Sequence, residues 1–374
     1  MKGYRVMRRR LFLALVPAVA AALLLPALPA QARTAEQDKN LLAGLVRTHV
    51  EKRAGALATA TADLAARVER FCAAPDGAGL EGARAGYGAA MDAWAGVQHV
   101  RPGPLLLEMR SDRIAFWPER RNIVARQVEQ LLAARDPKAL EPDAFAKQSA
   151  AVQGLTAVER LLFGDGVTAA SFGGEAGGHR CAVTLAVARN VAKLGAEVRD
   201  GWAALAPQLV AGAATPVGAS AKEAVDNLYA SLVTALQVVV DQKLLIPLGE
   251  SPADAKPALA ESARAGRSLK NIAINLAAMR AMVLGEDGGP GFAALLPDNA
   301  DGTAARKAVV KAFDDAAAAV KAVPAPLDKA VADPKQRKAV EAAFRAAKGI
   351  QTVLVQKLPP LIGVTLGFNE LDGD

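Results

Sequence analysis

One short segment carries polar side chains at a spacing that could bind a ligand or a cation. Residues 153–164 read Gln-Gly-Leu-Thr-Ala-Val-Glu-Arg-Leu-Leu-Phe-Gly. Thr156 and Glu159 are three residues apart and would share one face of a helix. In a cavity between helices, the Glu159 carboxylate could ligate a cation or act as a base. On spacing alone, a Thr-Glu pair on the surface or in a helix cap is the more common arrangement. The apolar stripe beside the pair consists of Leu155, Val158 and Leu162.

A second segment, residues 101–122, mixes charges of both signs with bulky apolar side chains. Arg110 and Arg113 could hold an anionic group through paired hydrogen bonds, in a pocket walled by Phe116 and Trp117. The other interpretation is an ordered crossing loop in which the arginines form structural ion pairs, which are common. The carboxylates available for such pairs are Glu108, Asp112 and Glu119.

Several widespread catalytic signatures do not occur in the sequence. There is no H-E-x-x-H motif, no Walker loop, no Gly-rich dinucleotide fingerprint and no G-x-S-x-G elbow. The three histidines, His49, His99 and His179, are widely separated, so a standard zinc site would require distant segments to come together. The sequence therefore predicts no standard zinc or hydrolase site.

The N-terminal segment has the three parts of a secretory signal peptide. Basic residues without any acid precede an apolar run from residue 11 to residue 28, and Ala30-Gln31-Ala32 offers a small-x-small cleavage site. Arg9-Arg10 before the apolar run resembles a twin-arginine signal, an alternative to the general secretory route. We expect residues 1–32 to direct export to the periplasm or cell envelope.

Removal of this peptide changes the charge balance. The chain has 45 basic and 38 acidic residues, and the peptide carries five of the basic ones, which leaves 40 against 38 and a net charge of +2. A nucleic-acid surface needs concentrated basic charge, so we expect no nucleic-acid partner.

Pro17 and Pro26 interrupt the apolar run, which argues against a membrane helix that is retained after export. We therefore expect no integral membrane segment in the mature chain.

Cys72 and Cys181 are the only cysteines. In an oxidising compartment outside the cytoplasm, such a pair indicates one structural disulfide. The alternative is two separate buried thiols.

Composition and periodicity predict an all-α fold. Alanine is abundant, aromatic residues make up 4% of the chain, and no alternating strand pattern is found. The mature length of 342 residues exceeds the usual limit of a single core. We therefore predict two packed helical-bundle domains of up-and-down four-helix character, residues 33–210 and 211–374, with one long bundle as the alternative.

Apolar stripes predict where the helices lie, and turn-rich segments between the stripes predict where the helices end. One helix is expected to begin at Pro118, in the first helical position, and to end before Asp136-Pro137. Trp94 and Trp202 stand among alanines and are expected in the core. The other predicted helices cover residues 40–72, 80–98, 141–163, 178–205, 217–245, 257–284, 303–322 and 334–357.

Several segments, in order along the chain, resemble the imelysin family. Residues 154–159 resemble its G-x-H-x-x-E signature, and residues 110–118 resemble its R-x-D-R-I-x-F-W-P segment, which includes Trp117. The resemblance covers essentially the whole mature chain and implies a periplasmic or surface protein of two helical bundles, with its site near their interface. Further matches are residues 241–249, 267–272 and 367–374.

The resemblance also implies a role for individual residues. Gly154 matches the motif glycine and Glu159 the motif glutamate, but Thr156 stands where the family has histidine. Threonine is a weak neutral ligand where imidazole would bind a metal or carry a proton. The family was classed with peptidases, yet a metallopeptidase scheme that uses the histidine lacks its ligand here, and we predict no catalytic residue.

Members of the family are tied to iron acquisition, which implies binding of iron, an iron complex or haem beside iron-uptake components of the envelope. We expect Glu159 to bind a hard cation such as Fe³⁺ or Ca²⁺ together with Glu108 and Asp112. Arg110 and Arg113 would hold an anion. The alternatives are an envelope interaction module without a small ligand and an imelysin-type peptidase.

Overall fold

The computed structural model describes residues 33–119, 121–324 and 326–367. These residues are mostly helical and contain no β-strand, so the predicted all-α class is confirmed. The predicted signal peptide lies outside the described residues.

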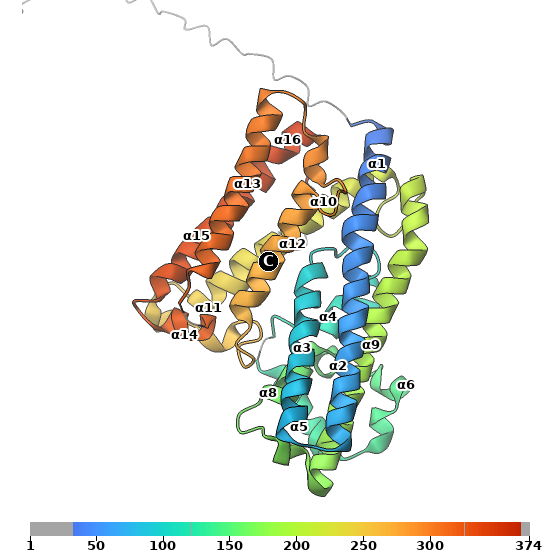
Figure 1. Ribbon diagram of the computed structural model, residues 1–374, viewed down its shortest axis with the longest axis vertical. Coiled ribbons are helices and arrows are strands. Elements are labelled where there is room, and N and C mark those ends of the chain that lie inside the picture. Colours follow the sequence, from blue (N-terminus) through green and yellow to red (C-terminus); the bar gives the residue numbers. More distant parts are fainter. Residues whose placement is uncertain (1–32, 120, 325, 368–374) are drawn as a thin grey trace, which may run out of the picture.

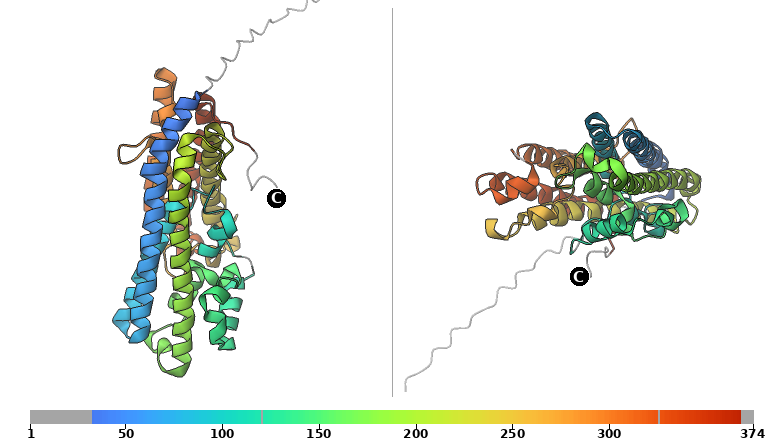
Figure 2. Two further views of the ribbon diagram at one scale, coloured as in Figure 1. Left: turned by 90° about the vertical axis from the view of Figure 1, so that its right-hand side faces the viewer. Right: turned by 90° about the horizontal axis from the view of Figure 1, so that it is seen from below.

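Long parallel and antiparallel helices form an N-terminal bundle. Helices α1 (Ala35–Leu45) and α2 (Lys52–Ala73) are joined by a π-helical turn, η1 (Val46–Glu51), into one rod. This rod packs along α3 (Gly77–Val97) and α9 (Gly174–Ala211), as Figures 1 and 2 show. The predicted helix over residues 40–72 is thus confirmed.

Small residues allow these rods to lie close together. A Cβ atom at Gly86 would come within 3.3 Å of the Leu64 backbone, and one at Gly195 within 3.3 Å of the Ala58 backbone. The rod starts at a capping box, because Thr34 accepts from the Gln37 amide and its own amide donates to the Gln37 side chain. The alanine-rich composition is therefore matched by close helix packing.

Short helices connect α3 to α9 and cover one side of the rods (Figure 1). They are α4 (Arg110–Ile114), α5 (Ile123–Ala134), α6 (Pro142–Phe145), α7 (Ala150–Gln153) and α8 (Leu155–Phe163).

The remaining helices form a C-terminal bundle in which α13 packs along α15. Helix α12 packs against α13 and also against α3, so it belongs to the contact between the bundles. This arrangement is consistent with the predicted two helical bundles, and the domain boundary itself stays a prediction. The bundle consists of α10 (Ala221–Gln237), η5 (Val238–Leu245), α11 (Ile246–Leu248), α12 (Ser268–Leu284), α13 (Ala300–Lys321), α14 (Leu327–Ala332), α15 (Arg337–Thr352), η9 (Val353–Lys357) and α16 (Leu358–Ile362).

Three predicted helices differ from the structure. The helix expected to begin at Pro118 begins at Ile123, because Arg121 and Asn122 have left-handed backbones with φ of 61° and 55°. The segment 257–267 forms short 3₁₀ and turn structure ahead of α12. The helix expected over residues 141–163 is divided into α6, α7 and α8, and Gly154 has an extended backbone between the last two.

The continuous helix Ala221–Leu248 is, in length and apolar composition, the one stretch of the described residues that could cross a membrane. In the fold, 67% of its most apolar window is buried. This stretch is the core helix of the C-terminal bundle. Trp94 and Trp202 are also buried, as predicted.

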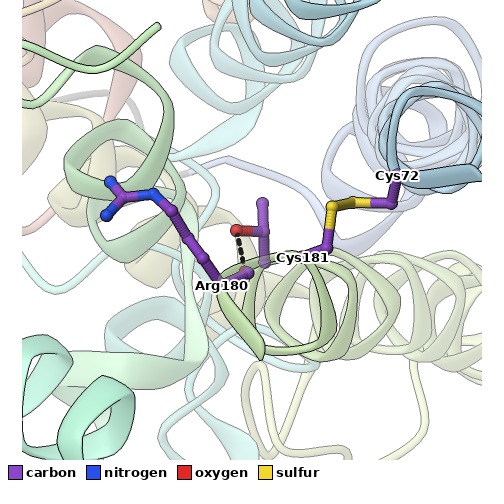
Figure 3. Close-up of a disulfide and its surroundings, with 4 residues drawn as sticks. Cys72, Arg180 and Cys181 are labelled. Atoms are coloured by element: carbon purple, nitrogen blue, oxygen red, sulfur yellow. Dashed lines mark hydrogen bonds between the residues drawn. A yellow bond between two sulfur atoms is a disulfide. The ribbon is translucent and has the colours of Figure 1, made fainter. Parts of the chain in front are cut away.

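Cys72 and Cys181 form the predicted disulfide, which joins the last turn of α2 to α9 across 109 positions of sequence (Figure 3). Phe71 and Phe172 pack edge to face beside it with ring centroids 4.8 Å apart. The Arg180 guanidinium lies 5.2 Å from the Phe172 centroid. The bridge therefore fixes the distal end of the N-terminal bundle.

Replacing both cysteines with alanine should lower the free energy of unfolding by about 2–5 kcal/mol, because a long closed loop restricts the unfolded chain. Urea denaturation of residues 33–374 measures this loss, and the wild type under reducing conditions should approach the double variant. Equal midpoints for the oxidised wild type and the double variant would contradict a stabilising bridge.

Candidate functional site

A cleft lies where the two bundles meet, and it has two adjoining parts. The outer chamber, which contains Thr156 and Glu159, has a volume of about 620 Å³. The inner chamber, which contains Gln98 and Asp112, has a volume of about 320 Å³. Both volumes suit a small organic ligand or a metal complex. Residues lining both chambers are Ala115, Trp117, Pro118, Gln242 and Glu261.

Segments far apart in sequence converge on this cleft. Residues 110–118, 154–159 and 241–249 each contribute side chains to its wall. The segment 267–272 lies behind the wall, where the Asn271 amide donates to Glu261 at 3.0 Å. Four of the five segments that carry the family resemblance are therefore brought together at the contact between the bundles, and most of the fifth, residues 367–374, lies outside the described residues.

Helix α8 presents Thr156 and Glu159 to the outer chamber, because its apolar stripe packs into the N-terminal bundle. Glu159 is only 4% exposed, and its carboxylate accepts the backbone N–H of Ala265 at 3.0 Å. Burial raises the pKa of Glu159 above its ordinary value. The prediction that the two residues share a face is confirmed, and the face is turned to the cleft.

Gly154 has a steric role in this arrangement. A Cβ atom there would lie 2.5 Å from the Arg113 carbonyl oxygen and would also overlap the Ile114 carbonyl. Only glycine lets the start of α8 approach the end of α4 so closely. The motif glycine therefore holds the segment 110–118 against the helix that carries Glu159.

A buried lysine lines the inner chamber. Lys243, in the π-helical segment η5, is hydrogen-bonded to Glu261 at 2.8 Å, to Asn275 at 2.8 Å and to Gln98 at 3.4 Å. These three acceptors use its three N–H groups. The Trp117 ring centroid is 5.7 Å from the ammonium nitrogen. Burial lowers the pKa of Lys243, and the Glu261 carboxylate opposes that shift.

The Lys243–Glu261 pair also fixes the loop that contacts Glu159. The Ser268 hydroxyl donates to the Glu261 carbonyl at 2.6 Å, and Ser262 shares a hydrogen bond of 3.1 Å with the Tyr87 hydroxyl of α3. The segment 260–265 is thereby held against the N-terminal bundle. This position aims the Ala265 amide at the Glu159 carboxylate.

The other predicted site residues have separate environments. Glu108 is 67% exposed in its side chain and lies 3.3 Å from Arg110 and 3.8 Å from Arg113. Arg110 also pairs with Glu197 at 2.8 Å, and Arg113 donates to Gln153 at 2.8 Å. None of Glu108, Arg110 and Arg113 lines either chamber.

Asp112 lines the inner chamber, whereas Glu159 lines the outer one. Over the part of the chain that the structure describes, no three His, Cys, Asp or Glu side chains gather as a set of metal ligands. The structure thus does not bring Glu108, Asp112 and Glu159 together around one cation. A cation at Glu159 would need further ligands of its own.

The mouth of the outer chamber is electropositive. Arg121, Lys256 and Arg264 are exposed there, and within the described ranges none of them forms an ion pair. The acidic residues of this chamber are less available. Glu119 accepts the Val124 amide at the start of α5, Glu159 is buried, and Glu261 is paired with Lys243. The chamber is therefore suited to an anionic ligand.

Sequence reasoning did not identify Lys243, Glu261 or Asn275 as site residues. A signal was present for Lys243, because the polar group Asp241-Gln242-Lys243 interrupts the otherwise apolar run 238–248. A charge in such a run indicates a buried, partnered group. No comparable pattern marks Glu261, which lies in a loop.

Replacing Lys243 with methionine should lower the free energy of unfolding by about 3–5 kcal/mol, because the Glu261 carboxylate would stay buried without its counterion. The double variant Lys243→Met, Glu261→Gln should regain much of that loss. Chemical denaturation measures both. If the single variant were as stable as the double variant, the Lys243–Glu261 ion pair would not be the main interaction that stabilises this wall of the cleft.

Replacing Gly154 with alanine should cost roughly 1–3 kcal/mol of stability, because the new methyl group overlaps two carbonyl oxygens. Gly55 in α2 is the matched control, since a Cβ there meets no atom within 4 Å. Gly55→Ala should be neutral or stabilising by up to about 1 kcal/mol. Thermal unfolding compares the two, and equal effects would contradict the close approach.

The family model described as Imelysin matches residues 50–354. The fold resembles an imelysin-like protein from Psychrobacter arcticum, with a TM-score of 0.75 and 22% identity over 90% of this chain and 98% of that one. It also resembles a protein from Parabacteroides distasonis described as an iron-regulated protein A precursor, with a TM-score of 0.73 and 15% identity over 88% and 96%. No curated protein matches. Because the family model covers most of the chain, the protein belongs to the imelysin family.

Proposed function

We propose that the protein binds an anionic iron complex in the cleft between its two bundles, in the periplasm or cell envelope, in support of iron uptake. The observation that carries this proposal is the outer chamber, in which three unpaired cations surround the mouth and Glu159 lies buried inside. Guanidinium groups bind carboxylates through paired hydrogen bonds, and an ammonium adds a point charge.

Complexed iron suits this site better than the bare ion. A ferric carboxylate complex or haem brings most of the metal's ligands with it, so the protein does not have to supply a full set. Glu159 then adds one contact. Because its pKa is raised, Glu159 holds a proton more readily and can donate it to a ligand carboxylate. In its ionised form, Glu159 offers an oxygen that is suited to Fe³⁺.

Two further parts of the proposal come from outside the cleft. Export rests on the signal-peptide pattern of residues 1–32. The choice of iron is supported by the family and by the description of the Parabacteroides distasonis protein as iron-regulated. Partners among the iron-uptake components of the envelope belong to the same proposal. We do not propose peptidase activity, because Thr156 takes the place of the motif histidine.

A second candidate function is an envelope interaction module without a small ligand. One observation favours it, an exposed apolar tip formed by Leu106, Leu107 and Met109, which are 42%, 47% and 61% exposed. Glu108 and Met109 have left-handed backbones with φ of 54° and 55°, which turn this tip outward. A tip of this kind could contact a protein partner.

Isothermal titration of ligand-free residues 33–374 with ferric citrate and with haemin tests the binding proposal. Arg264→Glu and Lys256→Glu should each weaken binding about 10- to 100-fold, because each removes a charge-assisted contact and adds a repulsive charge. Glu159→Gln should weaken binding without loss of fold. Affinity should also fall as salt is raised.

Lys307→Glu is the matched control, because Lys307 is an exposed lysine of α13 outside the cleft. It should leave affinity unchanged, and citrate without iron should bind more weakly than its ferric complex. A folded wild type that binds neither iron complex would contradict the proposal and favour the interaction module. Capture of an envelope partner that is lost on replacing Leu107 and Met109 with serine would then identify that module.

A further inference from the structure

Two histidines that are 50 positions apart in sequence meet at the contact between the bundles. His49 lies in the π-helical turn η1, and His99 follows α3. Their Nε2 atoms are 2.7 Å apart, and both side chains are at most 1% exposed. The other ring nitrogen of His49, Nδ1, is 2.5 Å from the Glu286 carboxylate. Carboxylate, imidazole and imidazole thus form one hydrogen-bonded chain, the Glu286–His49–His99 chain.

The partners assign the protons of this chain. A lone pair on His49 Nδ1 would repel the carboxylate at 2.5 Å, so Nδ1 carries the proton and donates it to Glu286. His49 Nε2 is then an acceptor, and His99 Nε2–H donates to it. The remaining atom, His99 Nδ1, is buried without a hydrogen-bond partner and holds a lone pair. The Arg53 Nε–H group lies 3.2 Å from His49 Nδ1, which in this tautomer has no lone pair left to accept it, and Arg53 Nη2 donates to both Glu286 oxygens at 2.9 Å.

A third proton has no favourable position on the two rings. On His49 Nε2 it would face the N–H of His99 at 2.7 Å. On His99 Nδ1 it would be a buried donor without an acceptor. The charges facing the pair from η1 and α2 are those of Lys52 and Arg53, and both are positive. Burial lowers the pKa of both histidines and the charge of Arg53 adds to the effect, whereas the hydrogen bond to Glu286 opposes it at His49.

The same chain fastens one bundle to the other. Glu286 and Asp287 follow α12, and they pair with Arg53 and Lys52 of α2. Beyond them, Gly289 packs directly on Thr48, with no space for a Cβ atom. The loop 285–291 of the C-terminal bundle therefore lies against η1 through contacts centred on His49.

The buried end of the chain reaches the wall of the cleft. The His99 carbonyl accepts the Ser231 hydroxyl of α10 at 2.7 Å, and Ser231 accepts the Arg101 amide at 3.1 Å. Gln98, next to His99, and Arg101 both line the inner chamber. A change in the position of His99 would therefore move this wall.

We propose that the Glu286–His49–His99 chain is an acid-sensitive latch: neutral rings hold the loop 285–291 and the end of α3 in place, and uptake of a further proton releases them. The direction of the pH dependence follows from the different proton affinities of the open and closed forms. Both histidines have a lower pKa in the closed form than the ordinary value of 6.5, so the open form binds protons more readily. The closed form is favoured above pH 6.5, and this advantage is lost as the pH falls below it.

Glu286 does not account for this range. Hydrogen bonds from His49 and Arg53 lower its pKa to about 2 against the opposing effect of burial, so it stays ionised until the pH is well below 4.5. As the pH falls from 6.5 toward the range in which Glu286 is protonated, the ratio of open to closed form should rise by up to about tenfold per pH unit for each proton taken up. The device does not depend on a bound ligand, so its test is independent of the proposed function.

The first test is a nitrogen-15 and carbon-13 NMR titration of the histidines in ligand-free residues 33–374. The chain has three histidines, and the variant His179→Gln assigns the signal of the one outside the latch. At pH 7.5 we expect His49 as the Nδ1–H tautomer and His99 as the Nε2–H tautomer. Protonation of either at an ordinary pKa with no change in the loop, or the opposite tautomers, would overturn the proposal.

The second test measures amide hydrogen exchange of residues 283–291, corrected for the intrinsic dependence of exchange on pH. In the wild type, protection should fall at least tenfold between pH 7.5 and pH 5.0, and His179→Gln should behave alike. In the double variant His49→Gln, His99→Leu, protection should be equal at the two values. A wild-type loop equally protected at both would refute the latch, and the NMR titration decides if the double variant does not fold.

Discussion

The ammonium group of Lys243 is buried between two helical bundles, and its neutralisation determines where the surrounding residues lie. The carboxylate of Glu261 must be close, which brings a loop of the C-terminal bundle over the mouth of the cleft. The amide oxygen of Gln98 completes the set from the other bundle. With this loop fixed, the Ala265 amide meets Glu159, so the motif glutamate is positioned by a charge pair on another element.

The contact between the bundles includes several polar pairs, which suit a site that is proposed to admit a ligand. Asp92 of α3 pairs with Arg267 and Lys270, and the Asn275 amide donates to the Ala95 carbonyl at 2.7 Å. Contacts of this kind can be exchanged with water at lower cost than an apolar interface. The same contact contains both chambers and the histidine pair. The proposed ligand site and the packing of the bundles therefore share residues.

The fold was largely predictable from the sequence because it depends on local patterns. Apolar stripes indicated the helices, and two cysteines in a chain expected to be exported indicated their bridge. The spacing of Thr156 and Glu159 indicated a shared face. The prediction that a helix starts at Pro118 was wrong. Arg121 and Asn122 have left-handed backbones, and the periodicity of apolar residues does not report such a local conformation.

The candidate site was less predictable because it depends on long-range pairing. Lys243 forms an ion pair with Glu261, which lies in a loop that no sequence pattern marks. His49 contacts His99, although the whole of α2 and α3 separates them in sequence. Glu108 was expected beside Glu159, but its left-handed backbone lies in a turn that exposes it to solvent. Thr156 and Glu159 are the side chains that α8 presents to the outer chamber, and Glu159 is the one carboxylate among them.

The most direct test of the central claim is the anomalous diffraction of iron in crystals of residues 33–374 grown with ferric citrate. We expect one iron peak in the outer chamber, between Glu159 and the side chains of Arg264 and Lys256. The citrate carboxylates should contact those two cations, and the peak should be absent from crystals grown with citrate alone. An iron peak elsewhere on the surface, or an empty cleft at saturating complex, would contradict the account.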